Sequence, residues 1–135
     1  MRQPWARSDT PPRIKLPPGR KRAILNEAEA FLTSYYRAEC IKPPPPDYEF
    51  NYIVDFSVRW SSPYLRFVAK YACPGPNAIS PSFETAFARL GCFAPDRFNL
   101  WGRRHNDRWF VVADRLALKG CFAEMRENPW FQMDW

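Results

Sequence analysis

The fold of this chain is decided by residues 50–72, which read FNYIVDFSVRWSSPYLRFVAKYA. Aromatic and β-branched side chains occupy every second position over residues 50–60, and this period of two is typical of a strand with one face on a core. The sequence SSP at residues 61–63 predicts a turn, and the alternation resumes over residues 64–72. The stretch therefore predicts an antiparallel hairpin. The core-facing side chains of its first strand are expected to be Phe50, Tyr52, Val54, Phe56, Val58 and Trp60.

Helical patterns lie on both sides of this hairpin. Asn26 and Glu29 have the spacing of a capping box, and apolar residues recur at helical spacing after them, which predicts a helix over residues 27–39. Four prolines at residues 43–46 cannot continue this helix and form a short polyproline spacer. A second helix is predicted around residues 118–125, because apolar residues again recur at helical spacing until an Asn-Pro pair stops them.

The remaining strands lie between the first hairpin and the last helix. Residues 98–104 and 109–113 predict a second hairpin joined by the turn HNDR. Residues 83–93 fit either a short helix or a strand, and we favour a strand over the second half of this segment. Together the elements predict an α+β fold, with a single antiparallel β-sheet of about four strands and an N-terminal and a C-terminal helix packed on one face.

Short motifs in the strands and after the last helix resemble small bacterial proteins classed as a domain of unknown function. The motifs are the strand Phe67-Val68-Ala69-Lys70, the Trp109 strand that follows a basic turn, and Glu127, Asn128, Trp130 and Phe131 after the last helix. The resemblance covers roughly residues 25–132, and it implies the same order of helix, strands and helix but no activity. The chain departs from the family pattern in its basic N-terminal segment and in its long proline-rich loop.

The whole net charge of +6 lies in residues 1–22. Seven of the 20 Lys and Arg residues and one of the 14 Asp and Glu residues are found there, so the rest of the chain carries equal numbers of both. Prolines alternate with these cations and few apolar side chains accompany them, which is typical of an extended, disordered segment. The sequence therefore predicts a disordered, basic, proline-rich arm over residues 1–22 and a single domain over residues 23–135.

Targeting and metal-binding patterns are absent from the sequence. No apolar run has the length of a signal-peptide core or the roughly 18 residues of a membrane span, so we expect a cytoplasmic protein without a membrane partner. The four cysteines form no CxxC pair of the kind that zinc sites and redox dithiols use, and free thiols are expected. No cofactor is predicted.

Cations in the arm and in the second hairpin are the candidate contacts to nucleic acid. Basic side chains bind phosphates, and Trp101 and Trp109 beside the hairpin could stack on bases. Alternatively, the arm could serve only as a solubilising tail or as a ligand of a proline-reading module. The tryptophans could likewise pack into the sheet while the arginines pair with acids. The acids available for such pairs are Asp107, Asp114 and Glu84. The candidate nucleic-acid-binding residues are Arg13, Lys15, Arg20, Lys21, Arg22, Arg103, Arg104 and Arg108.

Asp55 and Lys70 come nearest to a catalytic pattern. On neighbouring strands they resemble part of the Asp, then Asp/Glu-x-Lys, arrangement of metal-dependent nucleases. Val68 stands where the second metal-binding carboxylate is needed, so a nuclease-like domain could only be degenerate. A cross-strand pair of Asp55 with Lys70 or Arg66 is expected instead. His105 is the only histidine and lies in a predicted turn, so we predict a non-enzymatic protein without catalytic or metal-binding residues.

Two functions follow from these features. The first is a small accessory domain that associates with nucleic acid or a nucleoprotein complex through its basic N-terminal arm. The alternative is a protein-protein interaction module, because exposed aromatic side chains near a terminus commonly need a partner to cover them. Its contacts would be Trp130, Phe131 and Trp135. If these aromatic residues instead fold back onto the sheet, their removal will destabilise the domain.

Overall fold

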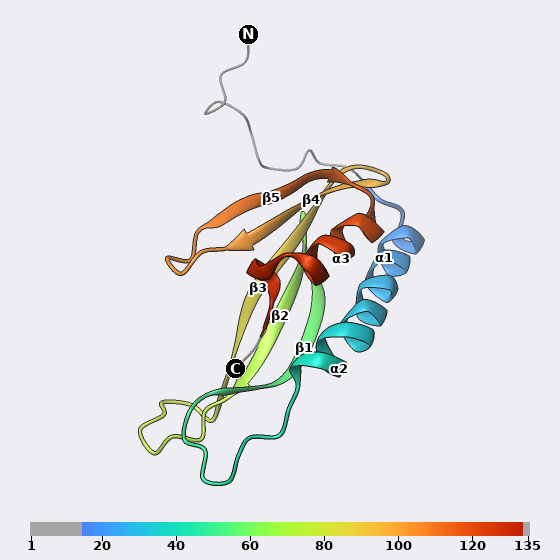
Figure 1. Ribbon diagram of the computed structural model, residues 1–135. Helices are drawn as coiled ribbons and strands as arrows, with labels where there is room; N and C mark the ends of the chain where they lie inside the picture. Colours follow the sequence, from blue (N-terminus) through green and yellow to red (C-terminus); the bar gives the residue numbers. More distant parts are fainter. Residues whose placement is uncertain (1–14, 134–135) are drawn as a thin grey trace.

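Five strands form one antiparallel sheet in the computed structural model, which describes residues 15–133 of the chain. Each strand pairs with its neighbours in sequence, so the spatial order is β1-β2-β3-β4-β5, and β1 and β5 form the two edges (Figure 1). The predicted α+β class and the single antiparallel sheet are confirmed. The strands are β1 (Tyr52–Ser61), β2 (Tyr64–Ala72), β3 (Ser82–Ala94), β4 (Arg97–Arg103) and β5 (Trp109–Leu116).

The strand beyond the expected four is β3, which contains the segment whose type the sequence left open. Residues 83–93 lie within β3 over their whole length, because this strand pairs with β2 on one side and with β4 on the other. Arg89, for example, faces Arg66 of β2 and Trp101 of β4. Pairing on both sides satisfies the backbone N–H and C=O groups of β3 and those of β2 and β4 that face it. A helix at this place would leave the facing groups of β2 and β4 unpaired. The expected number of about four strands was therefore too low.

The N-terminal helix is longer than predicted. It is α1 (Pro18–Phe31), and it begins at Pro18 rather than at Glu27. A proline suits the first turn of a helix, because its missing N–H has no intrahelical partner there. Ile24, which precedes the predicted start, is fully buried, so the additional turns contribute to the core. Residues 18–22 of the predicted disordered arm are therefore helical.

The helical segment continues beyond α1 and is tied to the sheet by an arginine. A π-helical stretch, η2 (Leu32–Arg37), is followed by a single turn, α2 (Ala38–Cys40). Arg37 at the end of η2 places its Nε 3.1 Å from Asp55 Oδ1 of β1, and its Nη2 donates to the carbonyl of Phe56 at 2.6 Å. These contacts fix the end of the helical segment against edge strand β1.

The C-terminal helix packs beside α1 on the same face of the sheet (Figure 1). It is α3 (Leu118–Glu127), and the short 3-10 turn η3 (Pro129–Phe131) follows it. The rings of Phe31 in α1 and Phe122 in α3 are stacked with their centroids 4.6 Å apart, which joins the two helices. No helix within residues 15–133 has the length and apolar character that crossing a membrane requires.

A β-bulge between Ile53 and Asp55 reverses the predicted alternation at the start of β1. After the bulge, Phe56 and Val58 are buried in the core, as predicted. Before it, Ile53 was expected on the polar face but is 1% exposed, whereas Phe50 was expected in the core but is 71% exposed. The extra residue of a bulge moves the side chains before it to the other face, so the local alternation could not be extended to the whole strand.

Candidate functional site

The sheet has one face packed against the helices and one face that carries none of the described helices, which we call the open face (Figure 1). Successive side chains of a strand point to opposite faces. In β2, Leu65 and Phe67 belong to the core, so Arg66 between them points to the open face. The open face is lined by Arg59, Tyr64, Arg66, Arg89, Trp101, Arg103 and Trp109.

Three arginines lie side by side across the open face and form what we call the arginine row. The register places Arg66 of β2 between Arg59 of β1 and Arg89 of β3. Neighbouring strands lie about 4.8 Å apart, so the backbone positions of the three residues span only about 10 Å. Like charges directly opposite each other destabilise a sheet, and the row therefore calls for compensating negative charge.

Acidic side chains compensate only one end of the arginine row. Arg59 Nη2 is 3.4 Å from Glu84 Oε1, and both side chains are exposed, which makes a weak ion pair. Within residues 15–133, neither Arg66 nor Arg89 forms an ion pair with a carboxylate. The Nε atoms of both are buried and have no hydrogen-bond partner in the described part of the chain. A buried donor without a partner costs about 1–3 kcal/mol.

Aromatic rings hold the guanidinium group of Arg89. Its central carbon lies 3.9 Å from the ring centre of Tyr64, 4.6 Å from that of Trp109 and 5.0 Å from that of Trp101. Contacts of this kind stabilise by about 0.5–2 kcal/mol. Trp101 is 1% exposed although it lies outside the core, because its neighbours on the open face cover it. Burial, and then the positive charge of Arg66, lowers the pKa of Arg89, which still remains charged at neutral pH.

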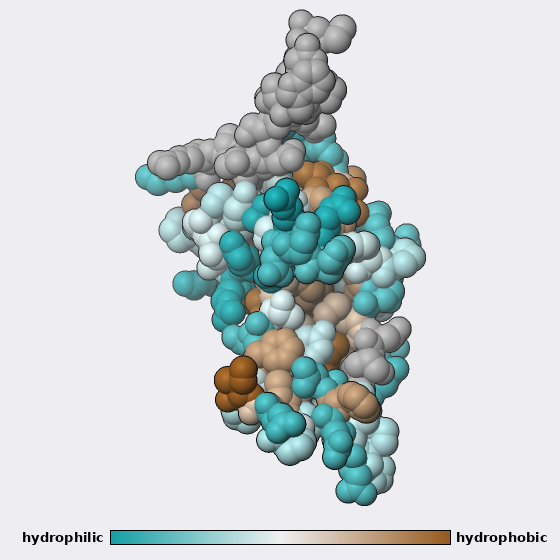
Figure 2. All heavy atoms as spheres, turned by 90° about the vertical axis from the view of Figure 1, so that its left-hand side faces the viewer, coloured by the Kyte–Doolittle hydropathy of each residue, from teal (hydrophilic) through white to brown (hydrophobic). Residues whose placement is uncertain are grey.

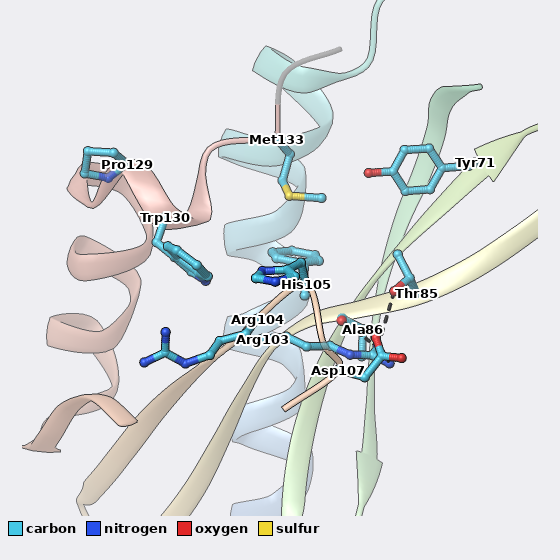
Figure 3. A pocket seen from close by; sticks show the side chains of 11 residues that line it. Tyr71, Thr85, Ala86, Arg103, Arg104, His105, Asp107, Pro129, Trp130 and Met133 are labelled. Carbon is cyan, nitrogen blue, oxygen red and sulfur yellow. Dashed lines mark hydrogen bonds and ion pairs between the residues drawn. The ribbon is translucent and has the colours of Figure 1, made fainter. Parts of the chain in front are cut away.

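Two of the three hairpin arginines predicted to bind nucleic acid, Arg103 and Arg104, point in different directions (Figure 3). Arg103 forms an ion pair with Asp107 at 3.2 Å, which is the pairing that the alternative interpretation anticipated. The side chain of Arg104 points away from that of Arg103, and its guanidinium lies 4.5 Å from the ring centre of Phe110 (Figure 3). Arg108 is exposed in the turn. Arg103 and Arg104 therefore do not form a single patch.

A hollow of about 540 Å³ lies beside this hairpin (Figure 3). Trp130 and Met133 of the C-terminal segment and Tyr71 of β2 border it, and His105 of the hairpin turn lies among them. Hydrophilic side chains cover most of this side of the molecule (Figure 2). His105 is exposed and has no hydrogen-bonded acid within the described residues, unlike the histidine of a catalytic triad.

Two cations near the start of α1 contact the sheet. Arg20 Nη2 is 3.1 Å from Asp96 Oδ1, in the turn between β3 and β4. Lys21 Nζ lies 5.3 Å from the ring centre of Trp60 in β1. Arg20 and Lys21 therefore fasten α1 to the sheet, although both were predicted to belong to a disordered arm. The other arm residues predicted to bind nucleic acid are Arg13, Lys15 and Arg22. Lys15 and Arg22 are exposed, and Arg13 lies outside the described residues.

The C-terminal aromatic residues predicted to contact a partner have different environments. Phe131 is 1% exposed, and its carbonyl accepts a hydrogen bond from the Tyr36 hydroxyl at 2.9 Å. It is therefore part of the core rather than of a docking surface. Trp130 is 47% exposed and packs edge-on against Phe110, with the ring centroids 4.9 Å apart. Trp135 lies outside the described residues.

Asp55 is paired with a helical residue rather than with the neighbouring strand. It faces Lys70 in the register of β1 and β2, but its ion pair is with Arg37 at 3.1 Å. The cross-strand ion pair expected from the sequence is not formed among the described residues. Within residues 15–133, no group of three or more His, Cys, Asp or Glu side chains is close enough to hold a metal ion.

Sequence reasoning missed the arginine row. Arg59 and Arg66 lie on the predicted polar faces of the first hairpin, but Arg89 belongs to the segment whose type was left open. The apolar residue Leu90 beside it could have indicated the position of Arg89. Leu90 is buried in the core, and the residue before it in a strand lies on the other face. The register that aligns the three arginines depends on a bulge between Phe67 and Val68, which no local pattern reveals.

Comparison with known protein families finds one family that matches most of the chain. A family described as a domain of unknown function (DUF3024) matches residues 16–132. This range contains every described helix and strand, and the match confirms the resemblance inferred from the sequence. No curated protein and no solved structure matches the chain.

Proposed function

Since the chain belongs to the DUF3024 family, whose function is unknown, we propose a function from its own surface. It is a small, non-enzymatic accessory domain that associates with nucleic acid or with a nucleoprotein complex in the cytoplasm. Polyanion binding is the property on which this proposal rests. Both the arginine row and the basic N-terminal segment supply cations for it.

The arginine row is the observation that carries the proposal. Arg66 and Arg89 keep guanidinium donors that no acid within the described residues uses. A phosphate group accepts two parallel hydrogen bonds from a guanidinium group, and nucleic acids present phosphates at regular intervals. A nucleic acid across the open face would relieve the repulsion between the arginines and accept hydrogen bonds from guanidinium N–H groups other than the buried Nε atoms.

The N-terminal segment, residues 1–14, adds further positive charge to the chain. Residues 1–14 contain Arg2, Arg7 and Arg13 against the single acid Asp9. Arg20, near the start of α1, forms an ion pair with Asp96 in the turn between β3 and β4. The cations of residues 1–14 would raise the affinity for any polyanion through counterion release, without specifying a sequence.

Salt dependence of binding tests the proposal. Fluorescence anisotropy with labelled DNA and RNA, each in single-stranded and duplex form, gives the binding constant K of the full chain over a salt series. We expect log K to fall linearly with log salt concentration. Replacing the three arginines of residues 1–14 by Gln should reduce the slope by about two to three, because each lost phosphate contact removes about 0.7–0.9.

A matched variant separates local charge from total charge. It carries the same loss of three cations in α3 and in the loop after α2, as Lys119→Gln, Arg126→Gln and Lys42→Gln. These side chains are exposed, so the variant should fold and retain the slope of the unmodified chain. Absence of binding at low salt, or equal slopes for the two triple variants, would contradict the proposal.

A protein-interaction function is the second candidate, and the exposure of Trp130 favours it. Its ring is 47% exposed, yet Asn128 fixes its backbone, since Asn128 Oδ1 accepts from the Trp130 N–H at 2.9 Å. Co-purification from the native host with and without nuclease treatment separates the two candidates. A partner that survives nuclease and is lost with Trp130→Ala, but not with Phe50→Ala at another exposed ring, favours this second function.

A further inference from the structure

We propose that the open face binds single-stranded nucleic acid, with the arginine row holding backbone phosphates and the rings of Tyr64 and Trp109 stacking on unpaired bases. The inference rests on the proposed function and specifies the form of nucleic acid and its place on the domain. Three observations lead to it: the adjacent guanidinium groups of Arg66 and Arg89, which pair with no carboxylate among the described residues, the aromatic rings beside them, and the fixed position of Arg89.

The centre of the arginine row has the geometry of a phosphate site. Arg66 and Arg89 are direct cross-strand partners, so their backbones lie about 4.5–5.5 Å apart. Each guanidinium group has five N–H donors in a planar fork, which matches phosphate oxygens. Both residues can therefore donate to one phosphate. Arg59, whose ion pair with Glu84 is exposed, lies on the next strand and is available to an adjacent phosphate.

The rings beside the row distinguish a single strand from a duplex. Tyr64 and Trp109 are half-buried and lie on the open face next to the guanidinium group of Arg89. In a duplex the bases stack on one another, so their faces are not available to a protein ring. In a single strand the faces of the bases are accessible, and sheet domains with exposed rings bind such strands by stacking. The combination of cations and rings on one face of the sheet thus fits a single strand.

The site is organised before any ligand binds. The guanidinium group of Arg89 is held by three rings at 3.9–5.0 Å, and the buried Trp101 forms the floor beneath it. A side chain already held in its binding position loses little conformational freedom when a ligand arrives. Arg89 is therefore a fixed donor, whereas an exposed lysine would have to be ordered on binding.

Binding of an oligothymidylate, compared with a mixed-sequence duplex of the same length, tests the inference on the full chain at low salt. We expect tighter binding of the single strand. Arg66→Gln should weaken it about tenfold through the loss of phosphate contacts, and Trp109→Leu about tenfold through the loss of base stacking. Lys119→Gln, which removes one exposed cation from the helix side, should change the affinity by less than about twofold.

Two conservative variants, Arg66→Lys and Trp109→Phe, test the same contacts if Arg66→Gln or Trp109→Leu disturbs folding. Arg66→Lys retains the charge but not the bidentate geometry, so weaker binding by this variant supports the inference and unchanged binding overturns it. Trp109→Phe retains an aromatic face and should bind within about threefold of the unmodified chain. Melting temperatures of all variants, measured by circular dichroism, report whether a loss of binding follows from a loss of folding.

The outcomes separate this inference from the proposed function. If the unmodified chain binds neither nucleic acid at low salt, both fail. If it binds but prefers the duplex, the proposed function stands and the inference is overturned. The same conclusion follows if Arg66→Gln and Trp109→Leu bind oligothymidylate as tightly as Lys119→Gln does.

Discussion

Gly102 of β4 lies directly beneath the indole ring of Trp130, so closely that a Cβ added to Gly102 would be 2.7 Å from Trp130 Nε1. The ring of Phe110 is also near, with its Cζ at 3.0 Å from the same added atom. Non-bonded carbon and nitrogen atoms prefer separations of about 3.5–4.0 Å. The absence of a side chain at Gly102 is therefore what allows the η3 segment to pack onto the sheet.

Replacing this glycine should destabilise the domain. We expect Gly102→Ala to lower the free energy of unfolding by about 1–3 kcal/mol, because the new methyl group forces Trp130 or the strand to move. Urea denaturation followed by circular dichroism measures the change. In a Trp130→Ala background the clash with the indole is removed and only the close contact with Phe110 remains, so the same substitution should cost less. Equal costs in the two backgrounds would show that the ring is not the cause.

Removing the hydroxyl of Tyr36 should also destabilise the domain. Tyr36 is 0% exposed, and its hydroxyl donates to the carbonyl of Phe131, so Tyr36→Phe leaves a buried acceptor unpaired. The expected loss is about 1–2 kcal/mol by urea denaturation. Tyr35→Phe is the matched control, because its hydroxyl donates to Gln132 at the surface and water can replace it. A larger effect of the Tyr35 variant would contradict this account.

Alkaline pH should reveal the burial of Tyr36. Burial raises the pKa of Tyr36 above its ordinary value of 10.0. The folded chain therefore keeps a proton that the unfolded chain releases, and the contribution to stability is complete below about pH 10 and is lost as the pH rises further. The loss amounts to at most about 1.4 kcal/mol per pH unit. Tyr36→Phe has no such group, so the difference in stability between the two proteins should narrow as the pH rises above about 10. A constant difference would contradict the prediction.

The cysteines should react with thiol reagents at different rates. Cys73 is half-buried, whereas Cys40, Cys92 and Cys121 are buried. Burial also raises the pKa of Cys121 to about 12, and the thiolate is the reactive form of the side chain. A colorimetric disulfide reagent should therefore modify Cys73 first and the other three only in denaturant. Cys73→Ser should abolish the fast phase; a fast phase that persists would show that a buried thiol is accessible.

The fold class could be predicted from the sequence because it depends on local periodicity. Alternation on both sides of the SSP turn in residues 50–72 is sufficient for a hairpin, and two such hairpins between helices give an α+β domain. The start of α1 and the length of β3 could not be predicted in this way. Ile24 and Arg89 acquire their roles from contacts with the rest of the sheet, and tertiary contacts override the weak local preferences of their segments.

The arginine row shows why a site formed by distant residues escapes sequence reasoning. The ion pair of Arg103 and Asp107 joins residues close in sequence and was anticipated among the alternatives. Arg59, Arg66 and Arg89 come from three strands, and only the register aligns them. A one-residue shift of β3 would turn Arg89 into the core, so their alignment is a property of strand pairing rather than of any motif.

The bulge in β1 also bears on self-association. An unpaired edge strand offers its backbone to a second chain, and a regular edge promotes aggregation. At this edge the ladder is interrupted between Ile53 and Asp55, and the guanidinium group of Arg37 occupies the carbonyl of Phe56. The bulge and the occupied carbonyl leave an incoming strand without a continuous set of partners there. The geometry thus hinders another copy of the chain from pairing with the β1 edge.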